Sequence, residues 1–306
     1  MRAVVFAYSN VGDRCLRVLH ARGVEVALVV THRDHPGETI WFDRVADTAA
    51  ELGLAIAFAD GGSDPALVEA VVRARPDVIF SFYFRALLAD EILRTAPGGA
   101  FNMHGSLLPR YRGRAPTNWA VLHGESETGA TLHAMVARAD AGDIVDQQAV
   151  PILPDDTALQ VFAKVTVAAE QILWRSLPSI MDGTVRFRPN EIERGSYFGS
   201  RRPEDGRIDW AQPASRVYNL MRAVAPPYPG AFTELLGIRL VVAKARRAPA
   251  GDAAPLPPGL HAVGEEIIGV CGDGGRISIH ELRAGGERMS AATLRALTAF
   301  TGPQSP

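Results

Sequence analysis

Through its first 150 residues this chain alternates short apolar runs with segments of helical period, and that alternation constrains its fold more than any other feature. The runs are rich in Val, Ile and Phe, as strands buried on both faces of a parallel sheet are. We predict these strands at Ala3–Ala7, Val26–Thr31, Ala55–Phe58, Asp77–Ser81 and Gly99–Met103. The segments between them predict the crossover helices that parallel strands require, at Gly12–Arg22, Phe42–Leu52, Pro65–Ala74 and Ala86–Arg94.

Beyond these elements the pattern changes twice. Two more strands, at 130–136 and 144–150, and a long helix, at 156–181, complete the predicted first domain. Residues 184–206 lose the periodicity and contain several prolines and glycines, which is typical of a linker. A chain of 306 residues is long enough for two domains. We predict a Rossmann-like α/β domain over residues 1–188, a linker over 189–205 and an OB-like β-barrel domain over 206–306.

The predicted second domain combines one helix with antiparallel strands. The helix spans 214–225, and the strand-like runs are Ala231–Leu236, Arg239–Lys244, Ile267–Cys271 and Arg276–Leu282. Their spacing favours a small barrel.

The first turn argues against a dinucleotide cofactor. In a Rossmann domain three glycines let the backbone approach a pyrophosphate at the start of the first helix. Here the turn Tyr8–Gly12 contains one glycine, and Asn10 and Val11 occupy positions where side chains block that approach. We therefore predict no NAD site, although ligands of such sheets still bind beyond the carboxyl ends of the strands.

Asn102 and His104 lie two residues apart at the end of a predicted strand, so both side chains leave the same face of the sheet. An amide, an imidazole and a carboxylate suit acyl transfer through an anionic intermediate, and Asp140 would supply the carboxylate. If Asp140 lies against His104, its charge favours the imidazolium form. The alternative is a buried histidine that has only found a hydrogen-bond partner.

The segments around these residues resemble formyltransferases that use 10-formyltetrahydrofolate. Phe101–Trp119 reads FNMHGSLLPRYRGRAPTNW, including the SLLP stretch that marks the family, and Glu127–Val145 reads ETGATLHAMVARADAGDIV. The resemblance implies 10-formyltetrahydrofolate as co-substrate and no metal. It implies that Asn102 stabilises the transition state, that His104 transfers protons and that Asp140 raises the basicity of His104.

The resemblance also implies folate contacts, and it covers nearly the whole chain. In the family the pterin is contacted by the segments that match Ala86, Leu87 and Leu88, by Arg114, and by Val136, Ala137, Arg138, Ala139 and Asp140. Without the resemblance, Arg112 and Arg114 read as a solvated loop face. Phe82, Tyr83 and Phe84 read equally well as core or as the wall of an apolar slot for the pterin.

Within the family the chain resembles most the domain of a bifunctional polymyxin-resistance protein that formylates UDP-4-amino-4-deoxy-L-arabinose during lipid A modification. The alternatives are methionyl-tRNA, another nucleotide-linked amino sugar, and a non-catalytic binding protein on the same scaffold. A net charge of −2 does not favour a nucleic-acid partner. Arg201 and Arg202 are candidates for the sugar nucleotide's phosphates, and the alternative is a pair of ordinary linker arginines.

We expect a cytoplasmic protein with no membrane insertion. The sequence begins directly with a strand-like run, and no apolar run approaches the roughly 20 residues that span a bilayer. Cys15 and Cys271 are far apart and have no metal-ligand spacing, as in a reduced compartment. The number of subunits is not predicted.

Overall fold

The structure, a computed structural model, describes residues 1–299 except 36 and 249–254. The chain forms two compact units. The first unit contains Met1–Pro116, Glu127–Pro151 and Phe162–Gly199, and the second contains Thr117–Ser126, Ile152–Val161 and Ser200–Pro306. The predicted division into domains at 1–188 and 206–306 stays a prediction.

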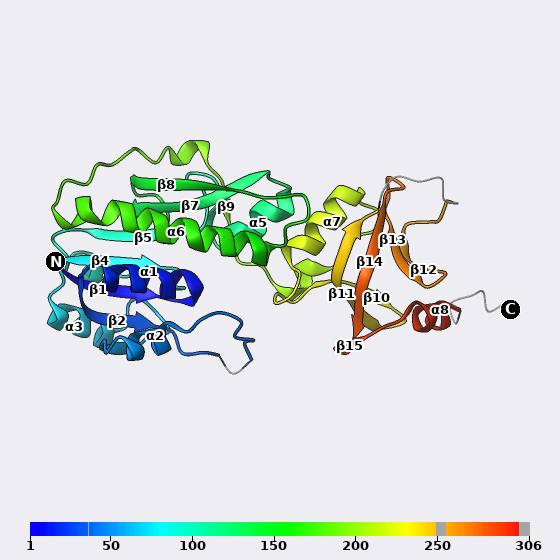
Figure 1. Ribbon diagram of the computed structural model, residues 1–306, viewed down its shortest axis with the longest axis horizontal. Coiled ribbons are helices and arrows are strands. Elements are labelled where there is room, and N and C mark those ends of the chain that lie inside the picture. The colour runs from blue at the N-terminus through cyan, green and yellow to red at the C-terminus, as the bar shows by residue number, and fades with distance from the viewer. Residues whose placement is uncertain (36, 249–254, 300–306) are drawn as a thin grey trace. The chain divides into compact units, whose positions relative to one another are not determined.

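The first unit is built on a seven-stranded sheet in the order β3-β2-β1-β4-β5-β7-β8 (Figure 1). Its strands are β1 Arg2–Ala7, β2 Glu25–Thr31, β3 Ile56–Phe58, β4 Val78–Phe82, β5 Ala100–His104, β7 Glu127–Ala134 and β8 Ile144–Pro151. The strands from β3 to β5 are parallel, as predicted, and the Rossmann-like fold is confirmed. The last two strands run antiparallel to β5 and to each other.

Four helices lie between the parallel strands, namely α1 Ser9–Ala21, α2 Val45–Glu51, α3 Pro65–Ala74 and α4 Asp90–Leu93. Two more helices flank the antiparallel strands, since α5 Pro116–His123 precedes β7 and α6 Ala158–Met181 follows β8. The start of α3 was predictable, because the Asp64 carboxylate accepts from the Ala66 N–H and Pro65 occupies the first helical position. An apolar cluster that includes Val4, Ile79 and Val71 packs α3 and α4 against the sheet.

Two predictions about helices were wrong. The predicted helix Ala86–Arg94 is reduced to α4, because Leu88 forms a β-bridge with Gly62 and the Ala89 N–H donates to the Gly62 carbonyl. The segment between β5 and β7, for which no helix was predicted, contains α5, and it also contains the short strand β6 (Arg112–Gly113), which pairs in parallel with β9 (Tyr197–Phe198). Two 3-10 turns follow, at Ile192–Arg194 and Pro203–Gly206.

The second unit contains a curled antiparallel sheet in the order β10-β11-β14-β13-β12, with β15 paired to β14. Its elements are α7 Ala214–Ala223, β10 Ala231–Leu235, β11 Ile238–Arg247, β12 Gly259–Val263, β13 Glu266–Val270, β14 Arg276–Ala284, β15 Glu287–Arg288 and α8 Ala291–Ala299. Within the described residues β10 and β12 do not pair with each other, so the predicted barrel is a half-barrel. The strand β12 and the helix α8 were not predicted.

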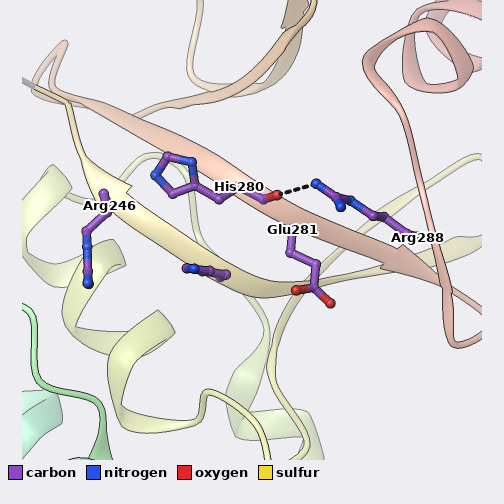
Figure 2. Close-up of a pocket in the computed structure, with 5 residues that line it drawn as sticks. Arg246, His280, Glu281 and Arg288 are labelled. Carbon is purple, nitrogen blue, oxygen red and sulfur yellow. Dashed lines mark hydrogen bonds between the residues drawn. The ribbon is translucent and has the colours of Figure 1, made fainter.

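An open groove of about 500 Å³ lies over β11, β14 and β15 of this sheet (Figure 2). Its lining residues are Lys244, Arg246, His280, Glu281 and Arg288. Cations outnumber the single carboxylate in the groove, but Arg246 lies 3.7 Å from Asp155 and Glu281 is paired with Arg283. Over 1–299, apart from the gaps, no helix combines the length and the apolarity needed to cross a bilayer.

Candidate active site

The carboxyl end of β5 brings the three predicted site residues together. Asn102 and His104 leave the same face of this strand, and His104 is its last residue. Asp140 comes from the loop between β7 and β8, and its Oδ1 lies 3.4 Å from Nδ1 of His104. Both side chains of this ion-pair contact are largely buried, which strengthens the interaction between their charges.

A fourth residue, His133, was missed by sequence reasoning. It lies directly opposite Asn102 in the antiparallel pairing of β5 with β7. The Asn102 Nδ2 lies 3.1 Å from His133 Nε2, which in turn lies 3.7 Å from Asp140 Oδ1. The Nδ1 of His133 lies 2.8 Å from the Ala134 carbonyl. Since that carbonyl only accepts, Nδ1 carries the ring proton and Nε2 accepts from the Asn102 amide.

Burial keeps His133 neutral. Desolvation lowers the pKa of this histidine from 6.5 to about 4, and the nearby Asp140 charge opposes the shift without cancelling it. A neutral imidazole fixes which atom of the Asn102 amide faces it, because only the NH2 group can donate. The amide therefore keeps one N–H and its carbonyl for other partners.

Both ring nitrogens of His104 have partners. Its Nε2 lies 2.8 Å from the Tyr111 carbonyl, so Nε2 carries a proton. A second proton, if gained on Nδ1, would face the Asp140 carboxylate at 3.4 Å and turn the ring into an imidazolium. A neighbouring carboxylate stabilises that charged form, so the pair can hold a proton and release it.

The loop that carries Asp140 is held from two sides. The Gly113 N–H donates to Asp140 Oδ2 at 2.9 Å, and the Asn190 amide donates to the carbonyls of Asp140 and Gly142. Asp140 has φ of +50°, a left-handed conformation that costs energy for a residue with a Cβ. These hydrogen bonds hold the carboxylate against His104 in spite of that cost.

The SLLP stretch is anchored to the antiparallel strands. The Thr131 hydroxyl on β7 donates to the Ser106 carbonyl at 2.6 Å and accepts from the Leu108 N–H at 3.1 Å. The Gln147 amide on β8 donates to the Thr131 hydroxyl and to the Leu108 carbonyl. Since Thr131 is completely buried, these bonds fix the loop that follows His104.

The chain matches the N-terminal formyl transferase model over residues 1–177 and the model of the formyl transferase C-terminal domain over residues 201–296. The chain belongs to the formyl transferase family. The prediction of a formyltransferase enzyme is therefore confirmed.

Solved structures share the fold of this formyltransferase at low sequence identity. An N-formyltransferase from Helicobacter canadensis, solved with folinic acid and dTDP-3-aminofucose, is 18% identical over 90% of this chain and 98% of that one, with a TM-score of 0.73. WlaRD, a sugar 3N-formyl transferase solved with dTDP and 5-N-formyl-THF, is 17% identical over 94% and 98% of the two chains, with a TM-score of 0.70. HypX from Aquifex aeolicus with tetrahydrofolic acid is 19% identical over 99% and 48%, with a TM-score of 0.66.

The formyltransferase places part of the predicted folate segments side by side. Arg114 is exposed, and its guanidinium donates to the Arg85 carbonyl at 2.9 Å, next to Ala86–Leu88. Leu87 is 71% exposed whereas Leu88 is buried, and Val136 is 48% exposed. Ala137 and Arg138 are exposed, and Ala139 is half-buried.

Of the aromatic residues predicted as core or as the wall of a pterin slot, one is in the core and one is partly exposed. Phe82 is completely buried and stacks on Phe80, so it belongs to the core. Phe84 is half-buried and stacks on the imidazole of His32 at 4.1 Å between centroids.

The two predicted phosphate contacts lie in the second unit. Arg201 lies over the Trp119 ring at 4.8 Å and donates to the Asp205 carbonyl, whereas Arg202 is exposed. In the described parts of the formyltransferase no group of three or more His, Cys, Asp or Glu side chains could hold a metal ion. That no metal is needed stays a prediction.

Proposed function

We propose that this formyltransferase moves a formyl group from 10-formyltetrahydrofolate to the primary amine of a nucleotide-linked amino sugar. The observation that carries the proposal is the cluster of Asn102, His104 and Asp140 at the end of β5, supported by His133. It combines a neutral hydrogen-bond donor with an imidazole and carboxylate pair that can hold a proton. Acyl transfer between two nitrogens needs both functions.

Each residue of the cluster has one role in the proposed reaction. The folate supplies the formyl carbon, which forms a bond to the sugar nitrogen and loses its bond to the folate nitrogen. The remaining N–H of Asn102 stabilises the negative charge that develops on the formyl oxygen. His104, with one proton on Nε2, takes on Nδ1 the proton that the sugar amine loses, is stabilised as an imidazolium by the Asp140 carboxylate, and returns to neutral by delivering a proton to the departing folate nitrogen.

The residues carried over from the family fit a folate. Ala86–Leu88 present an exposed Leu87 beside the cation of Arg114, and Val136 adds a second exposed apolar side chain. Apolar surface with a few polar groups is what a flat heteroaromatic ring with a polar edge requires. We propose that these segments and 137–140 hold the pterin.

We propose UDP-4-amino-4-deoxy-L-arabinose as the acceptor, in a cytoplasmic step of lipid A modification that leads to polymyxin resistance. Two structural relatives support a sugar nucleotide, since one was solved with dTDP-3-aminofucose and the other with dTDP. The loop RYRGRAP with Asn118 and Trp119 supports the arabinose form. Another nucleotide-linked amino sugar is the second candidate, and methionyl-tRNA is the third.

The test is a comparison of acceptors with the purified full chain. We expect the kcat/KM for formyl transfer from 10-formyltetrahydrofolate to be highest with the UDP-linked arabinose amine. A higher value with a dTDP-linked amino sugar would change the sugar, and a higher value with methionyl-tRNA would overturn the acceptor class. Asp140→Asn is the matched variant, because it keeps the shape of the side chain while removing the charge next to His104. We expect its kcat to fall about 10- to 100-fold.

A further inference from the structure

Arg112 is a buried cation without a counter-ion. The residue is only 7% exposed, and its Nε is buried with no hydrogen-bond partner. Among the described residues, none forms a hydrogen bond or an ion pair with its two Nη atoms. Its guanidinium carbon lies 5.9 Å from the centroid of the Tyr197 ring. Such a charge is costly to bury unless something pairs with it.

Other arginines with a buried, unpartnered Nε do not share this property. Arg222 donates through its Nη atoms to the carbonyl of Asp156 and to Asn219, and Arg201 donates to the Asp205 carbonyl. In those two cases the protein itself satisfies part of the guanidinium. In Arg112 the Nε and both Nη atoms of the guanidinium are left to hydrogen-bond to a ligand.

The position of Arg112 connects it to the formyl-transfer cluster. Its neighbour Tyr111 accepts from His104, and its other neighbour Gly113 donates to Asp140. Consecutive Cα atoms are about 3.8 Å apart, so Arg112 starts within one peptide unit of both contacts. Its own backbone N–H donates to the Ser196 carbonyl, which fixes β6 against the chain that leads into β9.

We propose that Arg112 forms an anion subsite that binds the diphosphate of the amino-sugar nucleotide. The inference rests on the proposed function for the identity of the ligand. A guanidinium meets a phosphate with two parallel N–H···O bonds, and this planar fork matches two phosphate oxygens better than an ammonium does. In a nucleotide-linked amino sugar the diphosphate is one sugar ring away from the amine. A residue beside the transfer cluster can therefore hold the acceptor by its phosphates while the amine reaches His104.

The ligand titrations use the full chain and its Arg112→Met variant, which keeps an apolar stem against Tyr197 and removes the charge. We expect pyrophosphate, UDP and dTDP to bind the wild-type chain by calorimetry, and uridine to bind far more weakly. In Arg112→Met the affinity for the three diphosphates falls about 100-fold, as the loss of two charged hydrogen bonds implies. Two matched controls, Arg110→Gln on the same loop and Lys244→Gln in the groove of Figure 2, keep the wild-type affinity.

The other outcomes overturn the inference. Loss of binding in Lys244→Gln, and not in Arg112→Met, moves the anion site to the groove. Weaker binding of 5-formyltetrahydrofolate by Arg112→Met, with unchanged diphosphate affinity, assigns Arg112 to the folate carboxylates. A fall of several degrees in the melting temperature of ligand-free Arg112→Met would show that Arg112 stabilises the fold itself. Removing an unpaired buried charge leaves stability unchanged or raises it.

The ligand titrations and the formyl-transfer assay can refute the anion subsite and the proposed function separately. If no amino sugar is formylated and diphosphates still depend on Arg112, the proposed function fails and the anion subsite stands. If amino sugars are formylated and Arg112→Met has the wild-type KM for them, the subsite fails and the function stands.

Discussion

Replacing His133 with glutamine removes a buried imidazole whose pKa lies far below its ordinary value. Burial lowers that pKa from 6.5 to about 4, with the Asp140 charge opposing the shift and His104 adding to it. Between these two pH values the unfolded chain binds a proton that the folded chain does not. The free energy of unfolding therefore falls as the pH drops below 6.5, and the loss is complete once the pH is below 4. The full loss amounts to about 3 kcal/mol, and most of it is reached by pH 4.5.

Urea unfolding of the full chain at pH 7 and at pH 4.5 measures this loss. We expect the wild-type free energy of unfolding to fall by about 2 to 3 kcal/mol more than that of His133→Gln over this range, because glutamine does not titrate. His20→Gln is the matched control, since His20 is exposed on α1 and its removal leaves the wild-type pH dependence in place. Parallel curves for wild type and His133→Gln would refute the assignment of a neutral, desolvated His133.

Three other perturbations address the site and the thiols. Asn102→Ala is expected to lower kcat at least about 100-fold with little change in stability, and a loss below tenfold would remove the amide from charge stabilisation. Thr131→Val leaves the Leu108 N–H without its acceptor and the Ser106 carbonyl without its donor, and urea unfolding is expected to show a loss of about 3 kcal/mol. Burial raises the pKa of the Cys271 thiol to about 11, so a thiol reagent at pH 8 is expected to label it only after urea is added. Rapid labelling of the native protein at Cys271 would contradict that expectation.

Local patterns predicted the fold where local interactions decide it. The strands of the parallel sheet are buried apolar runs, and α3 has both a capping Asp64 and a Pro65, so each element can be read from a few neighbouring residues. The segment 86–94 has a helical pattern, but the distant Gly62 pairs with Leu88 and pulls its first half into extended backbone. Strand β6 depends in the same way on β9, which lies more than 80 residues further along the chain. A pairing partner at that distance leaves no trace in a sequence window.

The site residues also differ in whether local sequence or distant strand pairing determines them. Asn102 and His104 were predicted together because residues two apart on a strand point to the same face, and the role of Asp140 was implied by the resemblance to formyltransferases. His133 stands within an apolar run, ATLHAMV, where a histidine looks like part of the core. Its period of two with Thr131 was visible in the sequence, but its partner Asn102 is fixed only by the antiparallel register.

The change of direction at the edge of the parallel sheet explains how so few residues organise this site. In an antiparallel pair, residues that lie opposite each other present their side chains on the same face. Asn102 lies opposite His133 and His104 lies opposite Thr131, so one strand, β7, supports both the amide and the loop that follows the imidazole. The loop after β7 then delivers Asp140 to the same face without a crossover helix. The register of a single strand pair therefore sets the positions of the donor, the proton carrier and the carboxylate together. A one-residue slip of β7 would turn His133 and Thr131 to the opposite face and remove both supports at once.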